Sequence, residues 1–375
     1  MQAGADTLRA MTASPAPIDE DHTHATVLDD VRIRQVRPLL SPALLQDEMP
    51  ADAAVQRFVQ AQRTQAADIV HGRDARLLVV VGPCSIHDHG QAMDYAQRLK
   101  HLADELADDL LIVMRVYFEK PRTTVGWKGY INDPHLDGSF RINEGLRLAR
   151  RLLLDIAQLQ LAAATEYLDL LSPQYIADLI SWGAIGARTT ESPSHRQLAS
   201  GLSCPIGFKN GTDGSVQMAA DALIASRSSH AFMGMTKMGQ VAIFETDGNA
   251  DAHIILRGGS RGPNYGAADI DAACALLRKA ALGEQVMVDC SHANSAKQVQ
   301  RQVEVARDLA QRVAAGDRRI MGLMIESHLR EGRQDLKPGV PLAPGVSITD
   351  ACIGWEATEQ VLRELAQAAK RRRAA

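Results

Sequence analysis

Eight short runs of apolar residues, separated by longer segments, constrain the fold of this chain more than any other feature. The runs cover 77–83, 110–116, 161–166, 184–188, 205–209, 253–258, 286–290 and 320–326. Continuous apolar runs of this length are typical of parallel strands buried on both faces. Two of the intervening segments, 92–106 and 295–316, have the apolar spacing of amphipathic helices. Right-handed crossovers would close eight such units into a (β/α)8 TIM barrel, which is an α/β fold.

The N-terminal part of the chain precedes this pattern. Residues 1–25 are small, polar and interrupted by proline, so we expect a flexible N-terminal arm. We predict that residues 26–75 form an N-terminal extension, made of a strand and a helix, with a role in assembly or regulation. Its strand is predicted over 31–40, where Val and Ile alternate with Arg and Gln, and its helix over 51–70, where apolar residues have helical spacing.

The predicted catalytic domain is the barrel over 76–375, with one insertion. Two strand-like runs flank Lys237–Gln240. They predict a β-hairpin over 231–246, inserted before the sixth barrel strand.

Charge and hydropathy exclude several classes of function. A net charge of -4 gives no general reason to bind nucleic acid, and the basic tail over 370–373 is best interpreted as a solvated helix end. The longest apolar runs are far shorter than the roughly 20 residues that span a bilayer, and the N-terminus lacks a signal-peptide pattern. We therefore expect a cytoplasmic protein that binds neither nucleic acid nor membrane.

The cysteines favour the same compartment. Five cysteines are an odd number, lie far apart and include no C-x-x-C pair, which argues against a disulfide framework and a zinc knuckle. Each is expected to be a reduced thiol, and a small buried hydrophobic residue is the default interpretation.

The polar residues at the strand ends indicate where chemistry takes place. In a (β/α)8 barrel, reactive groups gather at the C-terminal ends of the strands. Every strand here contributes one or more, namely Cys84, Arg115, Glu166, Arg188, Lys209, Arg257, Asp289, His292 and Glu326.

The cations of this set predict an anion site. With Lys120 and Arg122 just past the second strand, at least five cations would share one barrel mouth. Such a cluster repels itself unless anions fill it, and Arg forks suit phosphate and carboxylate oxygens. Taken alone, any one of them could equally be a solvated strand end or a structural ion pair.

Another set could hold a metal. Cys84, His292, Glu326 and Asp350 offer a thiol, an imidazole and two carboxylates, which together suit a first-row divalent ion. Barrel closure would bring the first and the last strands together. The alternatives are a buried cysteine, a capping histidine and a helix N-cap aspartate, and the residues alone do not decide between them.

Long motifs connect the chain to a known family. They are "GPCSIHD", "MRVYFEKPRTTVGWKGYINDP", "GARTTES", "GFKNGTDG", "HIILRGG", "DCSHANS", "GLMIESHL" and "SITDACIGWE". Across roughly residues 28–369 the chain resembles the short, microbial class of 3-deoxy-D-arabino-heptulosonate 7-phosphate (DAHP) synthases. These enzymes catalyse the first step of the shikimate pathway.

The resemblance implies the substrates and their binding residues. Phosphoenolpyruvate would condense with erythrose 4-phosphate, which together carry two phosphates and one carboxylate. By position, Arg122 and Thr123 match the erythrose 4-phosphate site. The matches to the phosphoenolpyruvate site are Arg115, Lys120, Arg188, Lys209 and Arg257, with Glu166 among them.

The resemblance also implies a metal-assisted reaction. Cys84, His292, Glu326 and Asp350 match the metal ligands, with Mn²⁺ the first candidate and Fe²⁺, Co²⁺ or Zn²⁺ the others. The metal would polarise the aldehyde, and C3 of phosphoenolpyruvate would attack it. Water would then add at C2 and phosphate would leave. Lys120 is the candidate proton donor to the aldehyde oxygen, and Cys84 and His292 complete the catalytic set.

Feedback inhibition by an aromatic amino acid is a further implication. The regulatory pocket would be lined by Pro173, Gln174, Leu198, Ser203, Phe232 and Gly234. The arm of a neighbouring subunit would complete it in a homodimer or homotetramer. Relatives sensitive to phenylalanine tend to have Ser where this chain has Gly234, and those sensitive to tyrosine tend to have Gly, so we expect inhibition by tyrosine. The alternative is a strand position that needs a small residue.

Three other functions compete with this interpretation. The sister synthase that uses arabinose 5-phosphate (3-deoxy-octulosonate 8-phosphate synthase) has Lys-Ala-Asn-Arg where this chain has "KPRTT". A Schiff-base aldolase would use Lys209. A non-catalytic phosphometabolite sensor would be expected to have lost a metal ligand, and all four are present.

Overall fold

The structure is a computed structural model that describes residues 28–122, 126–337 and 339–374. The chain divides into an N-terminal unit that ends at Pro38 and a compact unit that begins at Leu39. The arm predicted over 1–25 lies outside the described residues.

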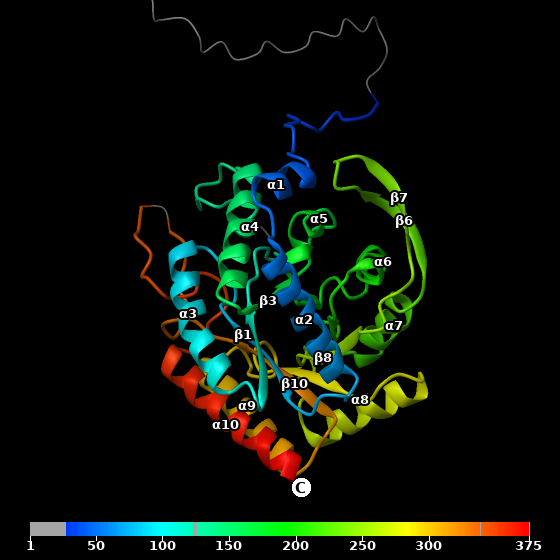
Figure 1. The fold of residues 1–375 in the computed structure, drawn as a ribbon, viewed down its shortest axis with the longest axis vertical. Helices are drawn as coiled ribbons and strands as arrows, with labels where there is room; N and C mark the ends of the chain where they lie inside the picture. The colour runs from blue at the N-terminus through cyan, green and yellow to red at the C-terminus, as the bar shows by residue number, and fades with distance from the viewer. Residues whose placement is uncertain (1–27, 123–125, 338, 375) are drawn as a thin grey trace, which may run out of the picture. The chain divides into compact units, whose positions relative to one another are not determined.

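Eight parallel strands form a closed barrel in the compact unit (Figure 1), which confirms the predicted fold. Every strand pairs with two neighbours, and the last strand of the barrel pairs with the first. In order around the barrel they are β1 (Leu77–Gly82), β10 (Ile320–Glu326), β9 (Val286–Asp289), β8 (His253–Leu256), β5 (Ile206–Lys209), β4 (Trp182–Ile185), β3 (Ala162–Glu166) and β2 (Leu110–Arg115).

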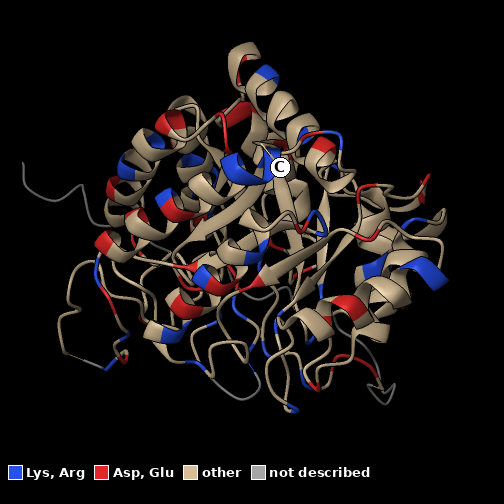
Figure 2. Ribbon diagram, turned by 90° about the horizontal axis from the view of Figure 1, so that it is seen from below, with Lys and Arg blue, Asp and Glu red and all other residues tan. Residues whose placement is uncertain are grey.

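Helices follow the strands and surround the barrel (Figure 1). They are α3 (His89–Glu105), α4 (Ile142–Gln158), α5 (Pro173–Ile176) with the 3-10 turn η1 (Ala177–Leu179), α6 (Pro193–Gly201), α7 (Val216–Ser226), α8 (Ala267–Lys279), α9 (Val299–Ala314) and α10 (Trp355–Ala374). Figure 2 shows basic and acidic residues interspersed on these helices. Among the residues that the structure describes, no helix has the length and apolarity needed to cross a membrane.

The helix predicted over 92–106 is confirmed as α3, whereas the one predicted over 295–316 begins later. Ala296 and Lys297 adopt left-handed φ angles of 50° and 59°, which are incompatible with a right-handed helix. Helix α9 therefore starts at Val299, after a turn that also contains His292.

Two helices precede the barrel, α1 (Pro42–Glu48) and α2 (Ala53–Val70), and α2 confirms the helix predicted over 51–70. Ala66 and Ile69 of α2 belong to the apolar cluster that fills the barrel, together with Leu78 and Trp182 near the beginnings of their strands. Helix α2 thus covers the N-terminal end of the barrel and leaves the C-terminal end for function.

The strand predicted over 31–40 is wrong. This segment contains no strand, and no strand among the described residues pairs with it. Its alternating Val31 and Val36 are 61% and 83% exposed. A strand needs a neighbour that supplies ladder hydrogen bonds, and sequence alternation alone does not provide one.

The predicted hairpin is confirmed. Strands β6 (His230–Met235) and β7 (Val241–Thr246) pair in antiparallel register between α7 and β8.

The fourth barrel strand begins two residues before its predicted start, at Trp182, whose side chain belongs to the apolar cluster of the barrel interior. As a result, Arg188 lies in the turn after β4 rather than at its last residue.

Side-chain alternation explains why charged residues meet at the C-terminal end. Leu111 and Val113 of β2 belong to the interior cluster, so Arg115 is the next side chain to point inward. In β3, Ala162 and Ala164 precede Glu166 in the same way. Two residues beyond the last apolar side chain of the interior, each of these strands therefore contributes a charged side chain to the mouth.

Candidate active site

Buried ion pairs form the floor of the barrel mouth. Lys209 Nζ lies 3.2 Å from Glu166 Oε2 and 3.4 Å from Asp289 Oδ2. Burial alone would lower the pKa of Lys209, but these two carboxylates outweigh it and raise that pKa above its usual value. Arg115 Nη2 lies 3.2 Å from Glu326 Oε1, and both side chains are almost fully buried. The protein's own carboxylates therefore balance part of the predicted cluster of cations.

Two arginines have buried N–H groups that are available to a ligand. Among the described residues, Arg115 Nη1 and Arg257 Nε have no hydrogen-bond partner. A buried N–H without an acceptor is rare, and an anion in the mouth would satisfy both. Burial lowers the pKa of Arg257, and neighbouring Arg188 lowers it further, so these two guanidiniums are close enough to repel each other. The unpaired donors and this mutual repulsion are consistent with the predicted anion site.

Next to these cations lies a cluster of possible metal ligands. The sulfur of Cys84 and one carboxylate oxygen each of Glu326 and Asp350 lie within 4.8 Å of one another. Burial, and then Glu326, raises the pKa of the Cys84 thiol to about 12. Lys120 and His292 outweigh burial and lower the pKa of Asp350 to about 2. A thiol and two carboxylates that converge in this way fit a first-row divalent ion.

The fourth predicted ligand lies at the edge of this cluster. His292 Nε2 is 4.0 Å from Glu326 Oε1, whereas Nδ1 faces away, 2.9 Å from Asp289 Oδ2. His292 has a φ of 56°, an uncommon left-handed conformation for a residue other than glycine. The structure thus brings three of the four predicted ligands together and leaves one imidazole nitrogen of the fourth directed at them.

Lys120 connects the anion and metal sides. Its Nζ donates to Cys84 Sγ at 3.1 Å and to the Cys84 carbonyl oxygen at 3.3 Å. A backbone hydrogen bond from Lys120 to Lys128 and a bridge between Glu119 and Gly129 close the loop that carries it. A Cβ at Gly129 would lie 2.0 Å from a backbone oxygen, so this close approach requires glycine.

Of the two residues predicted to bind the sugar phosphate, Arg122 lies on that loop. Arg122 is exposed, and its Nε donates to the Trp127 carbonyl at 2.8 Å. Thr123 lies outside the described residues. Their predicted role therefore stays a prediction.

Glycines make room for the inward side chains. A Cβ at Gly186 would lie 2.5 Å from Glu166 Oε1, and one at Gly82 would lie 3.1 Å from the backbone of Arg115. These two positions follow or end barrel strands, where a larger residue would displace a charged group.

Some residues of the site gave no signal in the sequence. The Arg115 guanidinium carbon lies 4.0 Å from the ring centroid of Tyr117, a cation–π contact. Buried Gln302 of α9 accepts from the backbone N–H of Glu326 at 3.0 Å and donates to its carbonyl at 3.3 Å. Tyr117 resembles any strand residue and Gln302 any helix residue, so only the fold reveals these contacts.

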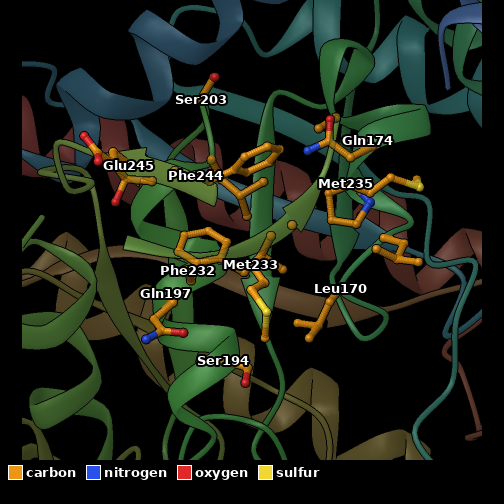
Figure 3. Close-up of a pocket in the computed structure, with 18 of the residues that line it drawn as sticks. Leu170, Gln174, Ser194, Gln197, Ser203, Phe232, Met233, Met235, Phe244 and Glu245 are labelled. Atoms are coloured by element: carbon orange, nitrogen blue, oxygen red, sulfur yellow. The ribbon is translucent and has the colours of Figure 1, made fainter. Parts of the chain in front are cut away.

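The six predicted regulatory residues surround one cavity of about 860 Å³ beside the hairpin (Figure 3). They are Pro173, Gln174, Leu198, Ser203, Phe232 and Gly234. The ring centroids of Phe232 and Phe244 lie 6.0 Å apart, and Glu245 adds a carboxylate to the lining. The cavity combines aromatic surface with polar groups, which suits a small amphipathic ligand.

The chain is similar to proteins of known activity. The model of the DAHP synthetase I family matches residues 54–363. The chain is 58% identical to the Phe-sensitive phospho-2-dehydro-3-deoxyheptonate aldolase of Escherichia coli (strain K12), over 92% of this chain and 98% of the relative. It is 51% identical to the tyrosine-inhibited enzyme of that name from Schizosaccharomyces pombe, over 95% of each. The solved structure of the aldolase from Francisella tularensis SCHU S4 matches with a TM-score of 0.89 at 49% identity, covering 91% of this chain and 99% of that one.

Proposed function

Because the chain belongs to the DAHP synthetase I family, we propose how its barrel mouth performs that family's reaction. The enzyme condenses phosphoenolpyruvate with erythrose 4-phosphate and water, and it releases DAHP and phosphate. One observation carries the assignment of residues: cations with unpaired buried donors lie beside the Cys84, Glu326 and Asp350 cluster in a single mouth.

Phosphoenolpyruvate occupies the cationic side of the mouth in this proposal. Its phosphate and carboxylate would accept from the unpaired donors of Arg115 and Arg257 and from exposed Arg188. Lys209 and Lys120 complete the charge, and Glu166 keeps Lys209 in place at 3.2 Å. Arg122 and Thr123, on the loop after β2, bind the phosphate of erythrose 4-phosphate.

The metal belongs to the other side of the mouth. Cys84, Glu326 and Asp350 would hold a divalent ion together with His292, and Mn²⁺ is the proposed ion. Such an ion, when bound, supplies Lewis-acid polarisation of the aldehyde of erythrose 4-phosphate.

Lys120 is the proposed proton donor. A bond forms between C3 of phosphoenolpyruvate and the aldehyde carbon, and the aldehyde oxygen takes a proton from Lys120 Nζ. Burial alone would lower the pKa of Lys120, but Cys84, Glu326 and Asp350 raise it, so the ammonium is charged before the reaction. Bond formation leaves C2 electron-poor, so water adds there and gives up a proton, which restores the Lys120 ammonium. The C2–O bond to phosphate then breaks as the C2 hydroxyl becomes the ketone and its proton leaves with the phosphate, which Arg115 and Arg257 stabilise.

The cavity beside the hairpin is the proposed effector site. Family relatives include a Phe-sensitive and a tyrosine-inhibited enzyme, so an aromatic amino acid is the effector class, and Gly234 supports tyrosine. Five free cysteines support a cytoplasmic setting. A homodimer or homotetramer belongs to the same proposal.

Reconstitution of metal-stripped enzyme tests this function. The stripped chain is incubated with both substrates, and Mn²⁺, Fe²⁺, Co²⁺ or Zn²⁺ is restored separately while DAHP and phosphate release are measured. We expect no product without metal and equal amounts of DAHP and phosphate with it. Binding of both substrates without product, with every metal, would instead support a sensor.

Two further assays test the competing enzyme activities. Arabinose 5-phosphate in place of erythrose 4-phosphate should give little product. Borohydride added with the substrates should not trap a covalent adduct on Lys209, because a Schiff base is absent from the proposed reaction.

A further inference from the structure

Asp289 is the last residue of β9 and is fully buried in the barrel mouth. Met287, two residues earlier, belongs to the interior cluster, so the alternation of β9 directs Asp289 inward as well. Its Oδ1 accepts from the backbone N–H of Ser291 at 2.9 Å and from Ser291 Oγ at 2.6 Å. The carboxylate is therefore fixed by its own strand end before it contacts any other element.

The second carboxylate oxygen contacts the histidine of the metal side. Asp289 Oδ2 lies 2.9 Å from His292 Nδ1, and Ser291 Oγ lies 2.6 Å from the same nitrogen. With Nδ1 held in this way, Nε2 is the nitrogen that faces Glu326, at 4.0 Å. The hydrogen bond at Nδ1 is to Ser291 Oγ, which itself donates to Asp289 Oδ1, whereas Asp289 Oδ2 is close to Nδ1 but has no hydrogen-bond partner among the described residues. A carboxylate placed behind an imidazole in this way favours the tautomer and the orientation that suit a metal.

The same oxygen contacts a lysine of the anion side. Asp289 Oδ2 lies 3.4 Å from Lys209 Nζ, although β8 separates β9 from β5 in the barrel. Glu166 contacts Lys209 from the opposite side at 3.2 Å. One oxygen atom is thus shared between an imidazole of the metal side and an ammonium of the anion side.

We propose that Asp289 is a positioning residue shared by both halves of the site, and that it couples the affinity for the divalent ion to the affinity for phosphoenolpyruvate. This inference rests on the proposed function, since it takes these two ligands as the occupants. With a divalent ion held by His292 and the other ligands, the imidazole would keep its proton on Nδ1 and attract the Asp289 carboxylate more strongly, which would leave Lys209 freer to contact the substrate's anionic groups. By linkage, phosphoenolpyruvate on Lys209 returns the carboxylate to His292 and tightens metal binding by the same factor.

The test compares Asp289→Asn with the unaltered chain. Free Mn²⁺ is measured by electron paramagnetic resonance in titrations of metal-stripped enzyme, with and without phosphoenolpyruvate and with no erythrose 4-phosphate. The unaltered chain should bind Mn²⁺ at least about 5-fold more tightly with phosphoenolpyruvate present. Asp289→Asn should raise the Mn²⁺ dissociation constant by ~10- to 100-fold and reduce the coupling factor toward 1.

Asp251→Asn is the matched control. It removes the carboxylate of another histidine pair, in which His71 Nε2 lies 2.7 Å from Asp251 Oδ1, just before the start of β8. It should leave both dissociation constants and the coupling factor unchanged. A structural role for Asp289 would lower the melting temperature without changing the coupling.

A second measurement needs no substitution of the buried aspartate. Long-range ¹H–¹⁵N spectra of the metal-free chain, assigned with His292→Asn, should show the His292 proton on Nδ1 and none on Nε2. A proton on Nε2, or coupling in Asp289→Asn equal to that of the unaltered chain, overturns the inference. Failure of the unaltered chain to bind phosphoenolpyruvate would overturn the proposed function instead.

Discussion

Lys120 Nζ lies 3.1 Å from Cys84 Sγ, so a single contact joins the proposed proton donor to the proposed metal ligand. The two residues come from different strands, since Cys84 follows β1 and Lys120 lies on the loop after β2. Barrel closure places both beside Glu326 of β10. The sulfur, which on sequence alone is best explained as a small buried group, therefore lies among charged side chains of the mouth.

Cys84→Ala should abolish metal-dependent activity and leave the fold intact. The change removes one buried sulfur and adds no bulk, so circular dichroism should be unchanged, while metal affinity and turnover should each fall by more than ~100-fold. Metal content by mass spectrometry and product release are the measurements. Cys204→Ala, which alters another buried thiol before β5, should retain both. Full activity in Cys84→Ala would exclude Cys84 from the metal site.

Lys120→Met should lower the turnover number far more than substrate affinity. Methionine keeps most of the side-chain volume but cannot donate a proton, and loss of a general acid lowers the rate by ~100- to 10,000-fold. Steady-state kinetics measure the turnover number and the Michaelis constants separately. Lys128→Met, an exposed residue of the same loop, should behave as the unaltered enzyme. An unchanged turnover number in Lys120→Met contradicts the role.

The strand ends were predictable because the apolar runs of the strands and the helical spacing between them indicate the same barrel. Continuous apolar runs separated by amphipathic segments predicted the barrel, and the barrel predicted that Arg115, Glu166 and Lys209 lie at one common end. The shared contact of Asp289 was not predictable, since it depends on the distance between side chains of β5 and β9, which are not adjacent strands. Sequence spacing gives the end of the barrel at which a residue lies, and it does not give the rotamer.

The errors have a related cause. The segment 31–40 has strand alternation but lacks a partner strand among the described residues, and no local pattern reveals the absence of a partner. The start of α9 was predicted too early, because the left-handed turn at Ala296 and Lys297 is built from residues that otherwise favour helices. In both places, tertiary contacts rather than local sequence pattern determine the backbone conformation.

Gly234→Ser should change the preference of the effector cavity. A Cβ at this position would lie 3.0 Å from the ring of Phe244, so a serine both fills space in the cavity and pushes that ring. We expect the unaltered enzyme to be inhibited by tyrosine, and Gly234→Ser to lose tyrosine sensitivity by about 10-fold relative to phenylalanine, roughly 1.4 kcal/mol of binding.

Inhibition curves with tyrosine, phenylalanine and tryptophan measure this preference. Met238→Ser, in the exposed turn of the hairpin and outside the cavity lining, is the control and should not change it. If phenylalanine inhibits the unaltered enzyme and tyrosine does not, the assignment based on Gly234 is wrong.

Buried His253 should make the fold less stable in acid. Its Nε2 accepts from Trp182 Nε1 at 3.2 Å, and its Nδ1 lies 3.0 Å from the Asp251 carbonyl, which assigns the neutral form. Burial lowers the pKa of His253 to about 4. In the unfolded chain the pKa is about 6.5, so the unfolded state binds more protons between these values. Stability from the neutral ring is fully present above pH 6.5 and is lost as the pH falls toward 4.

Urea unfolding of metal-stripped enzyme at pH 7 and pH 5 measures this effect without a contribution from metal release. His253→Gln can keep both hydrogen bonds but cannot titrate, so its free energy of unfolding should fall by about 2 kcal/mol less than that of the unaltered chain between these pH values. His101→Gln, at an exposed position of α3, should follow the unaltered chain. An equal loss in His253→Gln would mean that the acid sensitivity arises elsewhere, since the difference between the two chains isolates this one ring.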